Sequence, residues 1–227
     1  MTAAPLTRLR LKDTHRLIPS RYPPVGIFDA IAAPEDLELV LALEGWTNDH
    51  ISAELGVIRR IPSAEWAIDR PMAGVIMAAF CHPHPRGERF NSAGLGAWYA
   101  ARSLDTAHAE IIHHRTRELE EIGVRDARVE MRDYLADMDA EFHDIRGDDE
   151  AFAPLYDPDS YDAAQAFARP LRAGGSNGVL YRSVRHPGGE CVACFRPLLV
   201  ANVRQAAHFE YRWSGSPTPT ITPLAMR

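Results

Sequence analysis

The positions of apolar and polar residues along the chain follow two different periods. Helical spacing is clearest after Ser103, where one stripe is formed by Leu104, Ala107, Ile111 and Ile112. Because serine is a favoured N-cap residue, this pattern predicts a helix over 103–118. Partial alternation of apolar and polar residues predicts a strand over 126–135. The chain therefore contains both kinds of element.

Further elements follow from the same periods and from the residues that end them. Strands are predicted over 98–101, 179–184, 191–195 and 208–213. Helices are predicted over 34–43, 47–60 and 160–172. The apolar run 74–80 fits either a buried strand or a short buried helix. Pro187-Gly188-Gly189 predicts a hairpin turn between two of the strands.

The two ends and one internal segment are more polar than the rest. Residues 1–14 are predicted to be a loosely held N-terminal arm. The Pro/Thr/Ser-rich residues 214–227 are predicted to be a flexible tail. Residues 136–158 are rich in Asp and Glu, which favours a solvated, partly ordered excursion over a metal site.

Composition and net charge limit the kinds of molecule that the chain is expected to bind. The chain has 227 residues, of which 46% are hydrophobic and 25% charged, as in ordinary globular proteins. A net charge of −6 argues against a large nonspecific nucleic-acid surface. No apolar run reaches the roughly 18 residues that suggest a membrane span. The N-terminus lacks the apolar core of a signal peptide, so the sequence predicts a cytoplasmic protein without a membrane segment.

Cysteine and histidine raise the question of a metal. Three cysteines do not make a disulfide framework. Cys191 and Cys194 have zinc-knuckle spacing, but no second matching pair exists, and Cys81 with His82 would have to join them through the fold. The prediction is therefore that no metal is bound, with a zinc-dependent hydrolase as an alternative.

Two other pairs have catalytic spacing but lack the rest of a motif. Glu110 and His113 have di-iron spacing without a second copy, and Ser183 with His186 lacks the nucleophile elbow of a serine hydrolase. The chain also has no phosphate-binding P-loop and no dinucleotide glycine motif after a strand. From residue types alone, Tyr99, Glu110 and Ser183 are explained more simply as a strand aromatic, a helix-surface carboxylate and a strand hydroxyl.

Three segments, taken together, resemble the RES domain family, which is named for recurrent Arg, Glu and Ser residues. The first is 15–24, HRLIPSRYPP, which is similar to the opening arginine motif and contains Arg16 and Arg21. The second contains Arg89-Phe90-Asn91, Gly94, Tyr99 and Glu110, and the third is 178–185, GVLYRSVR, with Ser183. The segments occur in the family's order and span most of the chain.

The resemblance implies an α+β fold around a mixed, split and bent sheet like that of ADP-ribosyltransferases, with helical insertions. It places a single domain over 15–213. The chain is longer than a compact RES domain, which puts insertions at about 34–85 and 119–175.

The resemblance also implies an activity, the consumption of NAD by cleavage of its nicotinamide–ribose bond. Arg16 and Arg89 would hold the pyrophosphate as forked guanidiniums, with Arg21 as a weaker alternative to Arg16. Tyr99 would stack on nicotinamide, and Glu110 would stabilise the oxocarbenium-like ribose. Ser183 would bond the nicotinamide amide or position the attacking group. NAD is then a substrate, and no cofactor is implied.

Family members typically act as toxins, which implies an Xre-type helix-turn-helix antitoxin as partner, without direct nucleic-acid binding. The expected reaction is phosphorolysis of NAD by inorganic phosphate. The alternatives are a protein ADP-ribosyltransferase on the same scaffold, or a non-catalytic nucleotide- or partner-binding module. A homo-oligomer is compatible with the sequence.

Overall fold

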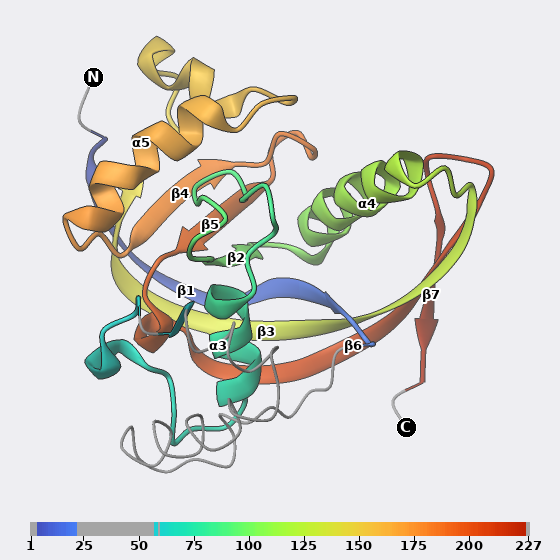
Figure 1. Ribbon diagram of the computed structural model, residues 1–227, viewed down its shortest axis with the longest axis horizontal. Coiled ribbons are helices and arrows are strands. Elements are labelled where there is room, and N and C mark those ends of the chain that lie inside the picture. The colour runs from blue at the N-terminus through green and yellow to red at the C-terminus, as the bar shows by residue number, and fades with distance from the viewer. Residues whose placement is uncertain (1–3, 22–56, 59, 226–227) are drawn as a thin grey trace.

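A computed structural model of the chain describes residues 4–21, 57–58 and 60–225 (Figure 1). The predicted helix over 34–43 lies outside these residues, as does most of the one over 47–60. No helix in the described ranges is both long enough and apolar enough to cross a bilayer.

The described elements form a mixed α+β fold, which confirms the predicted class. The strands are β1 (Leu6–Pro19), β2 (Trp98–Ala101), β3 (Asp126–Asp144), β4 (Gly178–Arg182), β5 (Glu190–Cys194), β6 (Ala201–Ser214) and β7 (Thr220–Leu224). The α-helices are α3 (Ala73–Cys81), α4 (Leu104–Glu121) and α5 (Asp162–Ala173). Short 3-10 helices are η2 (Ser63–Glu65), η3 (Glu150–Tyr156) and η4 (Pro197–Leu199).

The strands form one mixed sheet in the order β1-β2-β5-β4-β3-β6-β7. The β3–β4 pair is parallel and the other pairs are antiparallel. Because β1 also pairs with β3, the strands β1, β2, β5, β4 and β3 close into a ring. The long strands β1, β3 and β6 curve together beneath the short ones (Figure 1).

The predicted N-terminal arm is wrong for residues 6–14, which belong to β1. Leu9 and Leu11 alternate with charged residues, and the outward charges lie opposite those of β3. Arg8 is paired in register with Glu141, and its Nη2 lies 2.7 Å from Asp139 Oδ1. The basic arm and part of the acidic segment therefore stabilise each other as neighbouring strands.

Two other segments are also more ordered than their composition predicts. The predicted insertion over 119–175 includes β3, which is the longest strand described, so the acidic excursion is sheet up to Asp144. The predicted flexible tail contains β7, which pairs with β6 through residues 220–224. In both cases the pairing partner lies far away in sequence.

Two apolar clusters cover the two faces of the sheet. One contains α3, the buried helix at the run 74–80, together with Trp98 and Tyr134. The other contains Phe90, Tyr181 and Cys191 with residues of α4, α5 and η3. Since side chains alternate along a strand, Tyr99, Tyr181 and Cys191 share the second face, on which α4 packs.

Candidate active site

The centre of the candidate site is a hydrogen bond between α4 and the end of β4. Ser183 Oγ donates to Glu110 Oε1 at 2.6 Å. Ser183 Oγ also accepts hydrogen bonds from the backbone N–H groups of Arg185 at 3.1 Å and His186 at 2.9 Å. Ser183 is buried. The three hydrogen bonds fix the direction of its hydroxyl. The fold thus joins two predicted site residues from different motifs.

The loop before β2 forms a second rigid part of the site. Glu88 and Asn91 pair across a tight turn, and Tyr99 closes it. The Tyr99 hydroxyl accepts from Phe90 N at 2.8 Å and donates to Asn91 Oδ1 at 2.8 Å. Gly87 has φ +74°, and a Cβ there would lie 2.3 Å from Asn91 O, so the turn requires glycine. Tyr99 therefore orders the arginine-containing motif.

Arg89 lies in this loop but its guanidinium is already engaged. Its Nη1 donates to the carbonyls of Leu155 at 2.9 Å and Asp157 at 3.0 Å. Its Cζ lies 4.7 Å from the ring centre of Tyr161, and the residue is only 7% exposed. In the structure Arg89 binds the end of η3 and the residue that follows it.

The structure brings Arg16, rather than Arg21, to the other site residues. Arg16 Nη1 donates to Tyr99 O at 3.0 Å, and its Cζ lies 5.0 Å from the Trp98 ring centre. Burial lowers the pKa of Arg16, while Glu88 and other acidic groups nearby oppose that shift. Arg21 is exposed in the turn that follows β1.

Tyr181 is a site residue that the sequence reasoning missed. Burial raises its pKa well above the ordinary value, and the neighbouring Glu110 raises it further while Arg89 lowers it. Its ring meets Phe90 edge-on at 4.9 Å between centroids. The strand pattern contains the signal, because Tyr181 lies two residues before Ser183 and so shares its face.

The alternative catalytic pairs are not assembled. Cys191 and Cys194 lie in the two different apolar clusters, on opposite faces of β5. The His186 ring bonds Thr106 Oγ1 at 2.8 Å instead of Ser183. Over the described ranges, no three His, Cys, Asp or Glu side chains are grouped to hold a metal ion.

The thiols are expected to be unreactive in the folded protein. All three cysteines are buried thiols outside any disulfide, and burial raises the pKa of Cys194 to about 12. At pH 8 its thiolate fraction should be about a thousandfold smaller than that of a free cysteine. Titration with a chromogenic disulfide should label the thiols only after denaturation, with glutathione as the reactivity control. Rapid labelling of native protein would contradict this burial.

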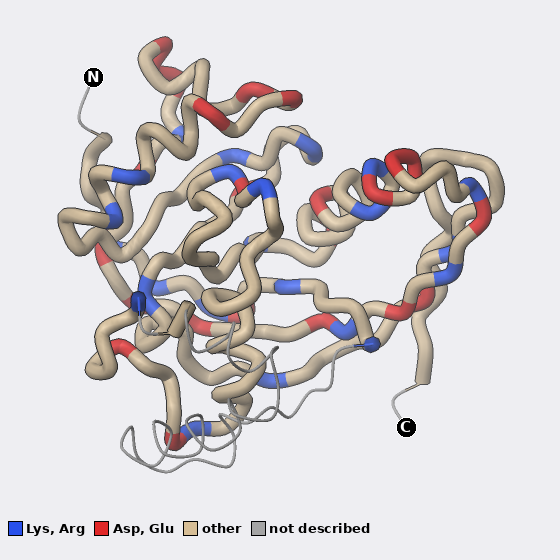
Figure 2. The backbone as a smooth tube through the Cα atoms, in the orientation of Figure 1, with Lys and Arg blue, Asp and Glu red and all other residues tan. Residues whose placement is uncertain are grey.

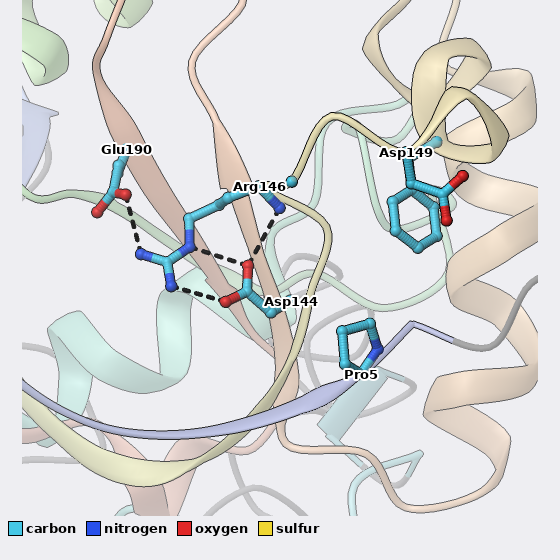
Figure 3. Close-up of a pocket in the computed structure, with 7 residues that line it drawn as sticks. Pro5, Asp144, Arg146, Asp149 and Glu190 are labelled. Carbon is cyan, nitrogen blue, oxygen red and sulfur yellow. Dashed lines mark hydrogen bonds and ion pairs between the residues drawn. The ribbon is translucent and has the colours of Figure 1, made fainter.

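A hollow of about 520 Å³ is lined in part by Glu190, the first residue of β5 (Figure 3). Arg146 crosses it, bonded through Nη2 to Asp144 Oδ2 at 2.7 Å and through Nη1 to Glu190 Oε1 at 2.9 Å. Neither Glu110 nor Ser183 lines this hollow. The bond between Ser183 and Glu110 therefore lies outside the lining of this charged hollow.

Charge around the site is mixed rather than uniform. Both acidic and basic residues occur along α4 (Figure 2). Near Glu110, the basic residues Arg89 and Arg185 lower the pKa of His113, although burial has the larger effect. The site combines the fixed carboxylate of Glu110 with several arginines.

Comparison with known proteins identifies the family. The RES domain matches residues 57–214, which include Arg89, Tyr99, Glu110 and Ser183, so this chain belongs to the RES domain family. The uncharacterized protein y4oC of Sinorhizobium fredii strain NGR234 is 25% identical over 218 residues, covering 93% of this chain and 87% of that protein. The crystal structure of the M. tuberculosis MbcT–MbcA toxin–antitoxin complex is similar with a TM-score of 0.48 and 13% identity, covering 89% of this chain and 86% of that one.

Proposed function

We propose that this protein consumes NAD by cleaving the bond between nicotinamide and ribose, with inorganic phosphate as acceptor. The observation that carries the proposal is the bond from Ser183 to Glu110, which fixes the direction of a carboxylate close enough to Tyr181 to raise its pKa. A fixed carboxylate is what a reaction with positive charge developing on a sugar requires. Membership of the RES domain family supports the same reaction.

In the proposed reaction the glycosidic C–N bond breaks and its electron pair leaves with nicotinamide, which departs as a neutral molecule. A phosphate oxygen then bonds the anomeric carbon, giving ADP-ribose phosphate. Glu110 stabilises the positive ribose and binds its hydroxyls, and Ser183 orients that carboxylate. Nicotinamide stacks on the Tyr99 ring. The positive charge already present on nicotinamide makes it a good leaving group.

The pyrophosphate of NAD is assigned to the arginines. Arg16 is the principal clamp, because it reaches the site from β1 and bonds only a carbonyl among the described residues. Arg89 contributes through the N–H groups that Leu155 and Asp157 do not use. Arg21 has the weaker claim because it is exposed outside the cluster.

We extend the proposal to the cellular role through the family alone. The protein acts as a cytoplasmic toxin, and an Xre-type helix-turn-helix protein neutralises it by covering the site. Self-association of the toxin is compatible with this role. Size-exclusion chromatography of the chain alone tests self-association. The same measurement after co-expression with an Xre-type protein encoded by an adjacent gene tests whether the two proteins form a complex.

Purified protein is expected to remove many equivalents of NAD only when inorganic phosphate is present. The measurement is NAD loss and product mass, with and without phosphate. Loss that does not depend on phosphate would indicate hydrolysis or, if protein becomes labelled, ADP-ribosyl transfer. Intact NAD after incubation with folded protein would overturn the enzymatic proposal and favour a binding module.

A further inference from the structure

Glu88 is a half-buried carboxylate that the proposed reaction does not yet use. Its backbone is fixed by two bonds to Asn91, with Glu88 N donating to Asn91 O at 2.9 Å, and Gln165 Nε2 donates to Glu88 O at 3.0 Å. Its Oε2 is inaccessible to solvent and has no hydrogen-bond partner within the described part of the chain. A carboxylate oxygen held in this way costs stability unless nearby cations compensate.

Two half-buried arginines supply that compensation. Arg16 from β1 and Arg172 from α5 both lower the pKa of Glu88, although burial raises it more. Arg172 Nη2 donates to Gly96 O at 2.8 Å, and its Cζ stacks 4.8 Å from the Phe195 ring centre. Arg172 is thus anchored by its own contacts, whereas Arg16 has a buried Nε without a hydrogen-bond partner among the residues described.

The Glu88 carboxylate stabilises the charged forms of both Arg16 and Arg172. Of the acidic groups that raise the pKa of Arg16, Glu88 has the largest effect, and it also raises that of Arg172. The one carboxylate and the two guanidiniums together have a net charge of +1. A remaining positive charge favours phosphate, while the carboxylate prevents two cations from repelling each other in a dry environment.

We infer that Glu88 is a positioning residue that holds the Arg16 guanidinium in place for substrate phosphate. This rests on the proposed function, in which Arg16 clamps the pyrophosphate. Arginine has a long side chain with many rotamers, so a fixed carboxylate beside it reduces the entropy lost when phosphate binds. Glu88 acts through Arg16 and does not contact the reacting atoms.

The test compares Glu88→Gln with Glu65→Gln. Glutamine keeps the shape of Glu88 but removes its charge, and we expect KM for NAD to rise about tenfold with a smaller change in kcat. Glu65 is a matched control, because it is a partly buried carboxylate bonded to an arginine, Arg196, away from the site. Equal melting temperatures of the variants establish that the fold is intact.

The pH profile distinguishes positioning from a structural role. The groups facing Glu88 are Arg16 from β1, Tyr99 from β2, Arg172 from α5 and Asn91 from its own turn. The raised pKa of Glu88 means that its carboxylate protonates at a higher pH than usual. As pH falls through that value the wild type loses the charge, so the wild-type advantage over Glu88→Gln should shrink. A constant advantage at all pH values would contradict the inference.

A double-mutant cycle establishes whether the effect passes through Arg16. Adding Glu88→Gln to Arg16→Lys should change KM less than twofold, because the positioned guanidinium is already absent. Full additivity of the two effects overturns the inference. If the wild type does not consume NAD, the proposed function is wrong, but the inference about Glu88 can still be tested. Calorimetry then measures the affinity of the wild type and of Glu88→Gln for ADP-ribose. Equal affinities of wild type and Glu88→Gln, or no binding to the wild type, then overturn it.

Discussion

Replacing Glu110 with glutamine is expected to lower NAD consumption at least about 100-fold while leaving the fold intact. A preorganised group that stabilises transition-state charge is typically worth about two to three orders of magnitude in rate. Glutamine retains a hydrogen bond to Ser183 Oγ but has no charge to offset the positive ribose. The loss should therefore appear in kcat more than in KM.

A suitable control is Glu118→Gln on the same helix. The Glu118 side chain is 42% exposed and pairs with Arg115 at 2.6 Å, so its replacement should leave NAD consumption unchanged. The two variants are compared by steady-state rates and by thermal unfolding. If Glu110→Gln retained wild-type turnover in folded protein, the carboxylate would not be the charge-stabilising group.

Features that depend on near neighbours in sequence could be predicted. The Ser103 side chain accepts from Thr106 N at 3.3 Å and caps α4, as the serine before the apolar stripe indicated. The predicted strand over 98–101 coincides with β2. The predicted turn at Pro187-Gly188-Gly189 lies between β4 and β5, which pair antiparallel. Caps and tight turns follow from a few adjacent residues, so local chemistry determines them.

The position of β1 could not be predicted in the same way. Its alternation is short and contains many charged residues, which resembles a solvated arm. The charges of β1 are balanced by acidic residues of β3, and Arg10 is in register with Asp139. This partner lies more than half the chain away, and composition alone does not show that the two segments pair.

The sequence could predict which residues belong to the candidate site, but not which partners their side chains contact. From residue types alone Glu110 was a helix-surface carboxylate, whereas in the structure it accepts a hydrogen bond from Ser183. Arg89 was predicted as a phosphate clamp, whereas the fold engages its Nη1 with two backbone carbonyls. Which partner a long side chain finds depends on distant loops, and sequence pattern contains little about them.

Replacing Gly178 with alanine is expected to destabilise the protein by about 3–5 kcal/mol, among the largest effects of a single substitution. Gly178 has φ +145°, a conformation that other residues rarely adopt. An added Cβ would lie 2.1 Å from Ala193 O and 3.0 Å from Cys194 Cα. Both are backbone atoms of the paired strand β5, so neither can move without breaking the ladder.

Urea denaturation measures this effect, with Gly147→Ala as the control. A Cβ at Gly147 meets nothing within 4 Å, so its free energy of unfolding should stay within about 0.5 kcal/mol of wild type. Since β4 carries Tyr181 and leads into Ser183, any Gly178→Ala protein that folds should also lose the bond to Glu110. An unchanged denaturation midpoint for Gly178→Ala would mean that β4 and β5 do not pair as closely as described.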